Sequence, residues 1–535
     1  MAQPMSTVAD LIVRQLVDAG VRTLFGMPGG GSSLDVLDAA ARAGMPFVMS
    51  HTETAGALMA SAQAELTGKP GASIATLGPG VASLANGLAH ARLDRVPLVV
   101  MTDGLPVAVR DVYEHQRIDH AALLGPVVKA SVTLDGRHAA SQVRAALRRA
   151  VTPPAGPVHL DCPSDIAQGP ASETKTADPS GVEASGGSTE FGPPASLART
   201  RRPVFIAGLG ARAPETVARL RTLCERRGAP VLVTYKAKGV VPDDHPCFAG
   251  VFTHAAIDEP FVRSGDLIVG VGLDPVELLP RPWHYPQPLI VCGTWPIGER
   301  HVRPAVQATG DLSRTLDALD ELLPRDTAWT SGEIRGQAER RRAAVRIEAP
   351  GFAPYRVIDA VSNVCPNARV TVDAGAHMFP VTALWPVRRP LDLLISNGLS
   401  TMGYALPAAI GAALLEPDRR VIAFTGDGGL LMCLAELSTA ARARLPVTVV
   451  VFGDRSLSLI RIKQERKGFR SDGVAIGAVD WPAVARGFGL SGARATDAAS
   501  LERAVEEAEA AGGPALVEAV VDPSVYPETL RAVRG

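Results

Sequence analysis

Short runs of Val, Ile and Leu alternate with longer helix-patterned segments along almost the whole chain of 535 residues. Such alternation is typical of repeated strand–helix–strand units, which build parallel sheets covered by helices on both faces. The runs fall into three blocks: RTLFGMP, FVMS, ASIATLG, PLVVMT and PVHLDCP; then PVFIAG, PVLVTY, LIVGVG and PLIVCG; then RVTVD, LDLLIS, VIAFT, VTVVVF and ALVEAVV. The sequence therefore predicts an α/β protein with three doubly wound parallel-sheet domains.

These blocks place the domains at residues 1–170, 201–340 and 350–535. Residues 171–200, between the first two domains, are rich in Pro, Gly, Ser and Thr, and we expect them to form an exposed linker. The first and third blocks are similar in size and in their pattern of strands and helices. An internal duplication would produce this similarity, although no residue-level repeat is visible.

Charge and cysteine content narrow the class of partner. The chain has 54 basic and 55 acidic residues, so no net field attracts nucleic acid or an anionic membrane, and a small ligand is expected instead. The six cysteines form no CxxC pair, which argues against a zinc site or a disulfide framework and favours the reducing cytoplasm. No signal-peptide pattern begins the sequence, and no run approaches the about 18 apolar residues of a membrane span, so we expect a soluble protein.

Two acidic residues follow neighbouring apolar runs in the third block. VIAFT is predicted to be a buried strand, GDGG a tight turn, LLMCLAELSTAARARL an amphipathic helix and VTVVVF the next strand. Because carboxyl ends of parallel strands share one sheet edge, Asp427 and Asp454 are expected to meet there. Gly426, Gly428 and Gly429 would let phosphate oxygens approach the backbone, and two carboxylates beside a phosphate suggest Mg²⁺.

The simpler interpretation is an ordinary GDG turn with Asp454 as a solvated loop residue, and for an isolated GDG it would usually hold. The whole segment, however, resembles the cofactor motif of thiamine diphosphate (ThDP) enzymes. The resemblance implies that Asp427, Asp454 and the carbonyl of Ser456 bind Mg²⁺, with Leu457 next to the cofactor. The chain departs from the family at Gly453–Asp454, where two asparagines are usual; the aspartate keeps an oxygen ligand but adds a negative charge.

Further segments resemble this family in the family's order: GMPGGGSSLDVLDAA, MSHTETAGALMASAQAELTGKPGASIATLGPG, ARLDRVPLVVMTDGLP, HQRIDHAALLGPVVK, DAGAHMF and SNGLSTMGYALPAAIGAAL. The resemblance implies that Glu53 is the acid that hydrogen-bonds the aminopyrimidine ring, although a first-turn helix residue is the simpler interpretation of Glu53 alone. It also implies cofactor contacts from a further set of residues. These are Pro28, Gly29, Ala376, His377, the carbonyl of Ser400 and Met402.

The family chemistry implied here is decarboxylation of a 2-oxo acid, followed by protonation of the resulting enamine or its ligation to a second carbonyl compound. Simple decarboxylases have an acid at the place of Gly30 and a histidine pair at the place of His115–Gln116. The HQ pair, Asp454 and the stretch GLDPVELLPRPW at 272–283 make the chain more similar to FAD-independent acetolactate synthases, although His115 could equally be a structural histidine. Arg461, Lys463 and Gln464 are predicted to lie near the substrate channel, where the simpler interpretation is a solvated helix face.

Two other expectations complete the prediction. GLGARA at 208–213 fits a loose dinucleotide fingerprint, so a flavin or nicotinamide oxidoreductase is the alternative from another class, but a lone fingerprint is weak and FAD is not expected. In the family, the pyrimidine-binding domain of one subunit faces the diphosphate-binding domain of another. The resemblance therefore implies a homodimer, or a dimer of dimers, with shared active sites.

Overall fold

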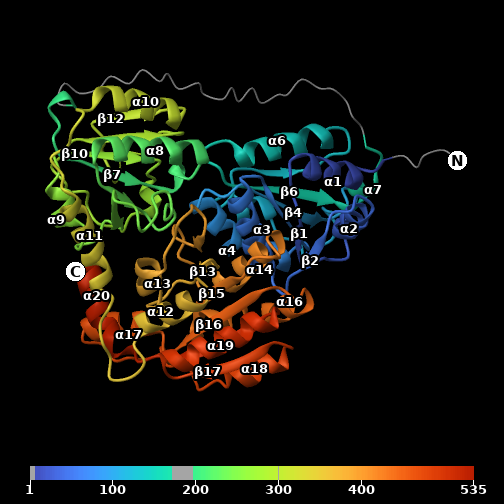
Figure 1. Cartoon of the computed structure of the whole chain (residues 1–535). Helices are drawn as coiled ribbons and strands as arrows, with labels where there is room; N and C mark the ends of the chain where they lie inside the picture. The colour runs from blue at the N-terminus through green and yellow to red at the C-terminus, as the bar shows by residue number, and fades with distance from the viewer. Residues whose placement is uncertain (1–5, 172–196, 299) are drawn as a thin grey trace. The chain divides into compact units, whose positions relative to one another are not determined.

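Three six-stranded parallel sheets form the framework of the computed structural model, which describes residues 6–171, 197–298 and 300–535 (Figure 1). The predicted α/β architecture of three doubly wound sheets is confirmed. The predicted linker, residues 171–200, lies mostly outside the described residues. The chain divides into two compact units, of which the first holds the N-terminal sheet and the second holds the other two sheets.

The first unit comprises residues 1–185, 398–419 and 433–447. Its sheet has the order β2-β1-β3-β4-β6-β5. The strands are β1 (Leu24–Gly26), β2 (Phe47–Met49), β3 (Gly71–Ala75), β4 (Leu98–Gly104), β5 (Ser131–Thr133) and β6 (Pro157–Pro163). The helices are α1 (Val8–Asp18), α2 (Ser32–Arg42), α3 (Glu53–Thr67), α4 (Pro79–Leu93), α5 (His120–Leu124), α6 (Ala139–Val151), α7 (Ser164–Gln168), α14 (Ala405–Leu415) and α16 (Glu436–Arg442).

The middle sheet of the second unit has the order β12-β11-β10-β7-β8-β9. Its strands are β7 (Pro203–Ala207), β8 (Val231–Val233), β9 (Phe248–Val251), β10 (Leu267–Val271), β11 (Leu289–Gly293) and β12 (Val306–Thr309). The helical segments with it are η1 (Leu197–Arg199), η2 (Leu209–Ala211), α8 (Pro214–Arg227), α9 (Glu259–Arg263), η3 (Pro275–Glu277), α10 (Leu312–Leu322) and α11 (Ser331–Ala343). Counted from β7, the order is 3-2-1-4-5-6, which is typical of dinucleotide-binding folds and puts the topological switch point between β7 and β10.

The third sheet, also in the second unit, has the order β14-β13-β15-β16-β18-β17. Its strands are β13 (Arg369–Val372), β14 (Leu393–Ile395), β15 (Val421–Gly426), β16 (Val447–Gly453), β17 (Ser491–Ala495) and β18 (Ala515–Val520). The helical segments are α12 (Pro354–Val364), α13 (Met378–Leu384), α15 (Asp427–Cys433), α17 (Ser458–Arg466), α18 (Trp481–Gly487), α19 (Ala498–Ala511), η4 (Pro523–Val525) and α20 (Tyr526–Arg534). This strand order is the same as in the first sheet, as an internal duplication would produce.

One expected element differs. The segment LLMCLAELSTAARARL was expected to be a single helix after a GDGG turn, but helix α15 already begins at Asp427, and a second helix, α16, begins at Glu436. The break coincides with the passage of the chain from the second unit into the first near Cys433. Each half therefore packs into a different unit, which one continuous amphipathic helix would not allow.

Helix α3 is buried on all sides, and small residues make this packing close. A Cβ on Gly411 of α14 would collide with the carbonyl oxygen of Met59 on α3, and a Cβ on Gly87 of α4 would lie 2.6 Å from the Cβ of Ala57. Helices that approach this closely leave no room for larger side chains at the crossing points. The close packing fixes the N-terminal end of α3, where Glu53 lies.

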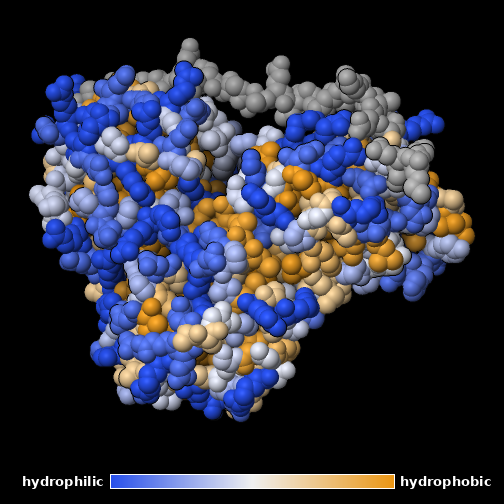
Figure 2. Space-filling model, turned by 45° about the vertical axis from the view of Figure 1, so that its right-hand side comes forward, coloured by the Kyte–Doolittle hydropathy of each residue, from blue (hydrophilic) through white to orange (hydrophobic). Residues whose placement is uncertain are grey.

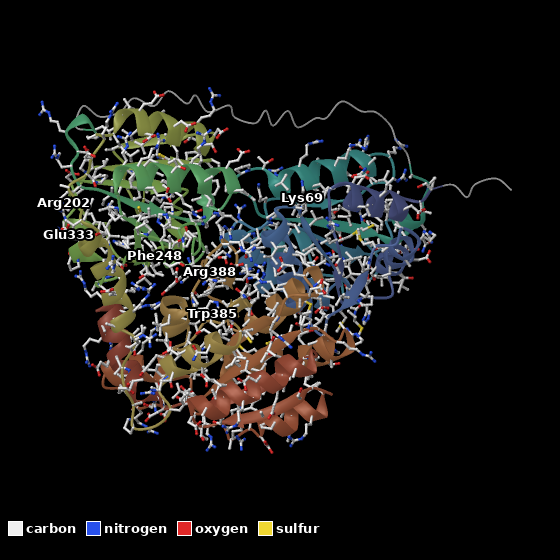
Figure 3. All side chains as sticks on the ribbon, in the orientation of Figure 1. Lys69, Arg202, Phe248, Glu333, Trp385 and Arg388 are labelled. Atoms are coloured by element: carbon white, nitrogen blue, oxygen red, sulfur yellow. The ribbon has the colours of Figure 1, made fainter. Side chains whose placement is uncertain are left out.

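A buried ion pair after β8 is linked to the third domain by a hydrogen bond. The ammonium group of Lys238 donates to the carboxylate of Asp243 and, at 2.9 Å, to the carbonyl oxygen of Trp385. Trp385, which is labelled in Figure 3, lies at the end of α13. Burial lowers the pKa of Lys238 and raises the pKa of Asp243. Removing one partner of such a pair leaves an uncompensated buried charge, at a cost of about 3–5 kcal/mol.

Among the described helices, none has the length and apolar character needed to cross a membrane.

Candidate active site

The residues expected to form the site fall into two groups, one in each unit. The second unit holds Ala376, His377, Gly426, Asp427, Gly428, Gly429, Asp454, Ser456 and Leu457. The first unit holds Pro28, Gly29, Glu53, His115, Gln116, Ser400 and Met402.

The acidic pair lies at the carboxyl ends of the neighbouring strands β15 and β16. Asp427 accepts hydrogen bonds from the N–H of Gly428 at 2.8 Å and from the N–H of Arg455 at 2.6 Å. Asp454 accepts from the N–H of Ser456 at 3.0 Å and from the hydroxyl of Ser458 at 2.6 Å. Because Asp427 binds the residue that directly follows Asp454, the turn after β16 is held against the start of α15.

This arrangement raises the pKa values of both carboxyl groups. Burial, followed by the charge of Asp454, raises the pKa of Asp427 to about 6. Burial also raises the pKa of Asp454, opposed by its hydrogen bonds and by the positive charge of Arg461. Burial and both aspartates raise the pKa of Tyr526, at the start of α20, well above its usual value. A concentrated negative charge of this kind is suited to a divalent cation, which takes oxygen ligands and compensates both carboxylates.

Glycines and a histidine shape the space beside this pair. A Cβ on Gly429 would collide with the carboxylate of Asp373, which accepts the hydroxyl of Thr425 at 2.8 Å. A Cβ on Gly426 would lie 3.4 Å from Nδ1 of His377, whose ring stacks on Phe452. Burial lowers the pKa of His377 to about 4, and its buried Nε2 has no hydrogen-bond partner within the described residues. A neutral imidazole with a free nitrogen beside a glycine turn is a feature that a bound polar ligand would explain.

The residues that follow Asp454 lead from the acidic pair into helix α17. Ser456 forms a bridge with Ala475, and the N–H of Leu457 donates to the carbonyl of Val474 at 2.8 Å, just before α17. On α17, Arg461 pairs with Glu465 at 3.8 Å and the amide of Gln464 donates to the carbonyl of Asp472 at 3.0 Å, while Lys463 is exposed.

A divalent cation held by this pair would bind in a pH-dependent way. A cation takes the ionised form of Asp427, so protons compete with it as the pH falls below the pKa of about 6. We expect Mg²⁺ affinity to be constant near pH 8 and to fall by about tenfold per pH unit well below that pKa, if one proton competes. Calorimetric titration of the protein with Mg²⁺ and ThDP between pH 5 and 8 would measure this; an affinity that stays flat over the range would contradict it.

In the metal-free protein, the same pKa shift affects folding stability, and this stability falls as the pH rises. The folded form holds the proton of Asp427 more tightly than the unfolded chain does, whose pKa stays near 3.8. The stability from this group is therefore complete below about pH 4 and is lost as the pH rises through about 6. Thermal melts with and without Mg²⁺ should consequently differ most on the alkaline side.

In the first unit, Glu53 begins helix α3 and is 8% exposed. Its side-chain oxygen Oε1 lies 3.1 Å from the position of a Cβ on Gly80. The turn before it is held by Glu436, a buried residue of α16 that accepts the N–H of His51 at 2.8 Å. Burial raises the pKa of Glu436. The sequence gives no local signal for Glu436, because an acidic residue within a predicted amphipathic helix usually lies on its polar face.

The segment of Ser400 and Met402 is anchored in the same unit. Asp94 accepts the N–H of Gly398 at 2.6 Å, and the hydroxyl of Thr401 donates to the side-chain oxygen of Asn86 at 2.9 Å. Ser400 is exposed, with a φ of 53°. A non-glycine residue held in the left-handed region carries strain, and such strain is found most often at functional sites.

Asp103, which was not among the predicted site residues, ties the GMPGG turn to the sheet. A Cβ on Gly29 would collide with Asp103, which accepts the hydroxyl of Ser33 at 3.1 Å. Pro28 and Gly29 are half-buried, whereas His115 and Gln116 are exposed, and Gln116 has a φ of 58°. Asp103 directly follows the run PLVVMT, so its place at a strand end was the available signal.

The switch point of the middle sheet is filled by the chain itself. The carboxylate of Glu277 accepts the N–H of Leu209 at 2.8 Å and the hydroxyl of Thr234 at 2.6 Å. A Cβ on Gly208 would lie 2.5 Å from the carbonyl oxygen of Gly272 and 2.7 Å from Glu277. Burial raises the pKa of Glu277 to about 7. The glycines of GLGARA thus allow close packing around an internal carboxylate, at the place where a dinucleotide-binding fold presents its amides to phosphate.

Comparisons with known proteins agree along the whole chain. Residues 6–123 match the N-terminal TPP binding domain of thiamine pyrophosphate enzymes, residues 195–319 match their central domain, and residues 373–519 match their C-terminal TPP binding domain. The catabolic acetolactate synthase of Raoultella terrigena is 31% identical over 96% of this chain and 95% of its own length.

Two further relatives have similar coverage. The acetolactate synthase of Bacillus subtilis is 29% identical over 96% of this chain and 93% of its own length. The acetolactate synthase isozyme 1 large subunit of Escherichia coli is 30% identical over 97% and 95%. With its three domains matched in order and relatives aligned over nearly their full lengths, this chain belongs to the acetolactate synthase-like members of the thiamine pyrophosphate enzyme family.

Proposed function

We propose that this protein is a ThDP- and Mg²⁺-dependent carboligase, which decarboxylates a 2-oxo acid and ligates the remaining carbon unit to a second carbonyl compound. The observation that carries the proposal is the Asp427–Asp454 pair, placed beside a glycine turn and an imidazole nitrogen without a partner. The full-length similarity to proteins named acetolactate synthase supports the same reaction class.

The residues present fit the cofactor. Asp427, Asp454 and the carbonyl of Ser456 would hold Mg²⁺, and the amides of Gly426, Gly428 and Gly429 would face the diphosphate. Ala376, His377 and Leu457 would border the diphosphate end, whereas Pro28, Gly29, Ser400 and Met402 would contact the ring end. When bound, ThDP supplies the nucleophilic carbon and the electron sink that allow a 2-oxo acid to lose carbon dioxide.

The chain's own residues would exchange a proton with the cofactor and hold the acceptor substrate. Glu53, buried at the start of α3, would exchange a proton with the cofactor's pyrimidine ring, as a carboxylic acid in a water-poor site can. Gln116 and His115, on the loop after β4, would hold the acceptor substrate. Arg461, Lys463 and Gln464 would line its channel, where the positive charges of Arg461 and Lys463 favour an anionic acceptor.

The glycine at position 30 favours ligation over simple decarboxylation as the reaction. A Cβ at this position would meet no atom within 4 Å, so the turn offers open space where simple decarboxylases of the family have an acid. An acceptor molecule can use that space, whereas the enamine would lack one of its proton donors. A non-ligating 2-oxo acid decarboxylase or a 2-hydroxyacyl lyase of the same family is the alternative.

The reaction can be tested with pyruvate, ThDP and Mg²⁺. We expect mass spectrometry of the products to show a carbon–carbon coupled 2-hydroxy acid besides carbon dioxide. A panel of other 2-oxo acids, offered as donor and as acceptor, would identify the natural pair. Finding acetaldehyde alone, with no coupled product from any pair, would favour the decarboxylase.

We also propose that the middle sheet is structural. Glu277 already accepts the N–H of Leu209 at the switch point, so this backbone donor is not available to a phosphate group. A flavin or nicotinamide oxidoreductase would have to displace that carboxylate. A purified protein with a flavin absorption band would argue for the oxidoreductase and against our proposal.

We further propose a homodimer, or a dimer of such dimers, with active sites shared between subunits. The space-filling view shows hydrophobic residues reaching the surface among charged ones (Figure 2). Large exposed apolar side chains include Val112 and Tyr113 in the first unit, 74% and 55% exposed, and Met432 in α15, 60% exposed. Aromatic residues and Met are enriched in the cores of subunit interfaces. The six cysteines are buried and form no disulfide, which suits the reducing cytoplasm that we propose as the location.

A further inference from the structure

The turn Gly78–Gly80, at the start of α4, lies between Glu53 and the imidazole of His120. On one side, Oε1 of Glu53 lies 3.1 Å from the position of a Cβ on Gly80. On the other side, the N–H of Gly78 donates to Nε2 of His120 at 3.3 Å. The turn also packs against Gln116, whose carbonyl oxygen lies 2.7 Å from the position of a Cβ on Gly78. A displacement of this turn would therefore disturb Glu53 and Gln116 together.

The contacts of His120 determine which of its two ring nitrogens carries the proton. A backbone N–H can only donate, so Nε2 of His120 must be the acceptor and carries no proton. The proton of the neutral ring therefore lies on Nδ1, which donates to the carboxylate of Asp161 at 3.0 Å. Asp161, in β6, thus fixes the tautomer that Gly78 requires.

Asp161 and the neighbouring His159 belong to one hydrogen-bond network at the end of β6. The hydroxyl of Thr133 donates to Asp161 at 3.3 Å. Burial lowers the pKa of His159 to about 4, and its two ring nitrogens bind the hydroxyls of Thr102 and Ser131 at 2.8 and 2.7 Å. Because both nitrogens of His159 are already engaged, these side chains form a support for His120 rather than a metal site.

A cavity of ≈ 200 Å³ lies next to this network, at the carboxyl ends of the strands of the first sheet. Leu77, Gln116, His120 and Asp161 are among its lining residues. Ligands of open α/β sheets bind at this edge. The His120–Asp161 pair thus lies where it can control the shape of a substrate-binding region.

We propose that His120 and Asp161 are a positioning pair, which holds the Gly78–Gly80 turn and through it aligns Gln116 and Glu53 for the proposed reaction. The alignment rests on the proposed function, whereas the hold on the turn does not. His120 acts through the turn, so its loss lowers the rate of the chemical step more than the affinity for substrate.

The first test compares H120L with H120Q. Leucine removes both hydrogen bonds, and a misplaced active-site group can lower the rate by about 100-fold, so kcat should fall by about 10- to 100-fold. KM for the 2-oxo acid should change by no more than about threefold, because uniform binding is untouched. Glutamine can accept from Gly78 through its side-chain oxygen, so H120Q should recover a large part of kcat.

A matched control is available in the same unit. His138 forms a similar pair with Asp135, with Nδ1 and Oδ1 3.0 Å apart, but both side chains are 52% exposed at the start of α6. H138L should leave kcat and KM unchanged. An equal loss of kcat in H138L and H120L, or no recovery in H120Q, would overturn the proposal.

The second test is independent of activity. Hydrogen exchange read by mass spectrometry should show faster exchange in the peptide that contains Gly78 for H120L, and near-normal exchange for H120Q and H138L. H120Q keeps the test valid if H120L does not fold. Unchanged exchange or unchanged kcat in a folded H120L would refute the positioning pair. Faster exchange in H120L, with a wild-type protein that forms no coupled product, would instead refute the proposed reaction and leave the hold on the turn intact.

Discussion

Replacement of Glu53 by glutamine is expected to lower kcat by about 10³-fold while the protein still binds ThDP and Mg²⁺, because the variant loses a general acid–base group and none of the metal-site residues. Glutamine has nearly the same size and can still hydrogen-bond, but it cannot take up and release a proton at neutral pH. Calorimetry would measure cofactor binding, and product formation from pyruvate would measure turnover.

The position of Glu53 is the physical reason for so large an effect. Glu53 is 8% exposed and its Oε1 lies next to the Gly78–Gly80 turn, so bulk water cannot readily replace it as a proton carrier. Turnover in E53Q equal to that of the wild type would remove Glu53 as the proton-exchanging group.

Replacement of Asp427 by asparagine should abolish Mg²⁺-dependent binding of ThDP. Loss of an outer-shell partner typically costs about 10- to 100-fold in metal affinity, and a direct ligand should cost at least as much. Asparagine also has a single acceptor oxygen, so it cannot accept from both Gly428 and Arg455 as the carboxylate does. Calorimetric titration of the variant with ThDP at several Mg²⁺ concentrations would measure the loss.

D454N is the matched control for D427N. The asparagine can accept from the N–H of Ser456 and donate to the hydroxyl of Ser458, so the turn after β16 should keep its conformation. It removes the charge that helps to raise the pKa of Asp427, so Mg²⁺ should still bind and its loss on acidification should shift to lower pH. If D427N bound Mg²⁺ and ThDP as tightly as D454N and the wild type, Asp427 would not be a metal ligand.

Mixing the two inactive variants tests whether active sites are shared between subunits. If Glu53 and Asp427 of different chains form one site, each E53Q–D427N heterodimer contains one intact site. Random exchange makes half of the dimers heterodimers, so mixing should restore about a quarter of wild-type activity. A site built within one chain would leave the mixture inactive.

The sequence predicts those site residues whose place follows from local pattern and from the parallel arrangement of strands. Asp427 and Asp454 each come directly after a buried apolar run, and parallel strands bring their carboxyl ends to one edge, so their proximity follows once the strands are recognised. The place of Glu53 at a helix start also follows locally, since Thr52 caps the helix by accepting the N–H of Ala55. These positions depend on patterns a few residues long.

Other residues could not be predicted because their partners come from distant loops. His120 pairs with Asp161 across 41 residues, Glu277 with the backbone of Leu209 across 68 and Glu436 with that of His51 across 385. Each contact depends on the order of strands in a sheet and on the path of the loops between them, which local patterns do not encode. The break between α15 and α16 has a similar origin, because only the packing of both halves into different units separates them.

By itself, the sequence determined the three parallel sheets, the acidic pair of the third domain and the helix-start glutamate of the first. Periodicity, turn glycines and strand ends are local, and they act before distant parts of the chain meet. Only the tertiary structure decided that Glu277 fills the switch point of the middle sheet and that His120 supports the turn beside Glu53. Both positions depend on the tertiary structure, because a buried carboxylate or imidazole is stable only beside the donors and acceptors that folding brings to it.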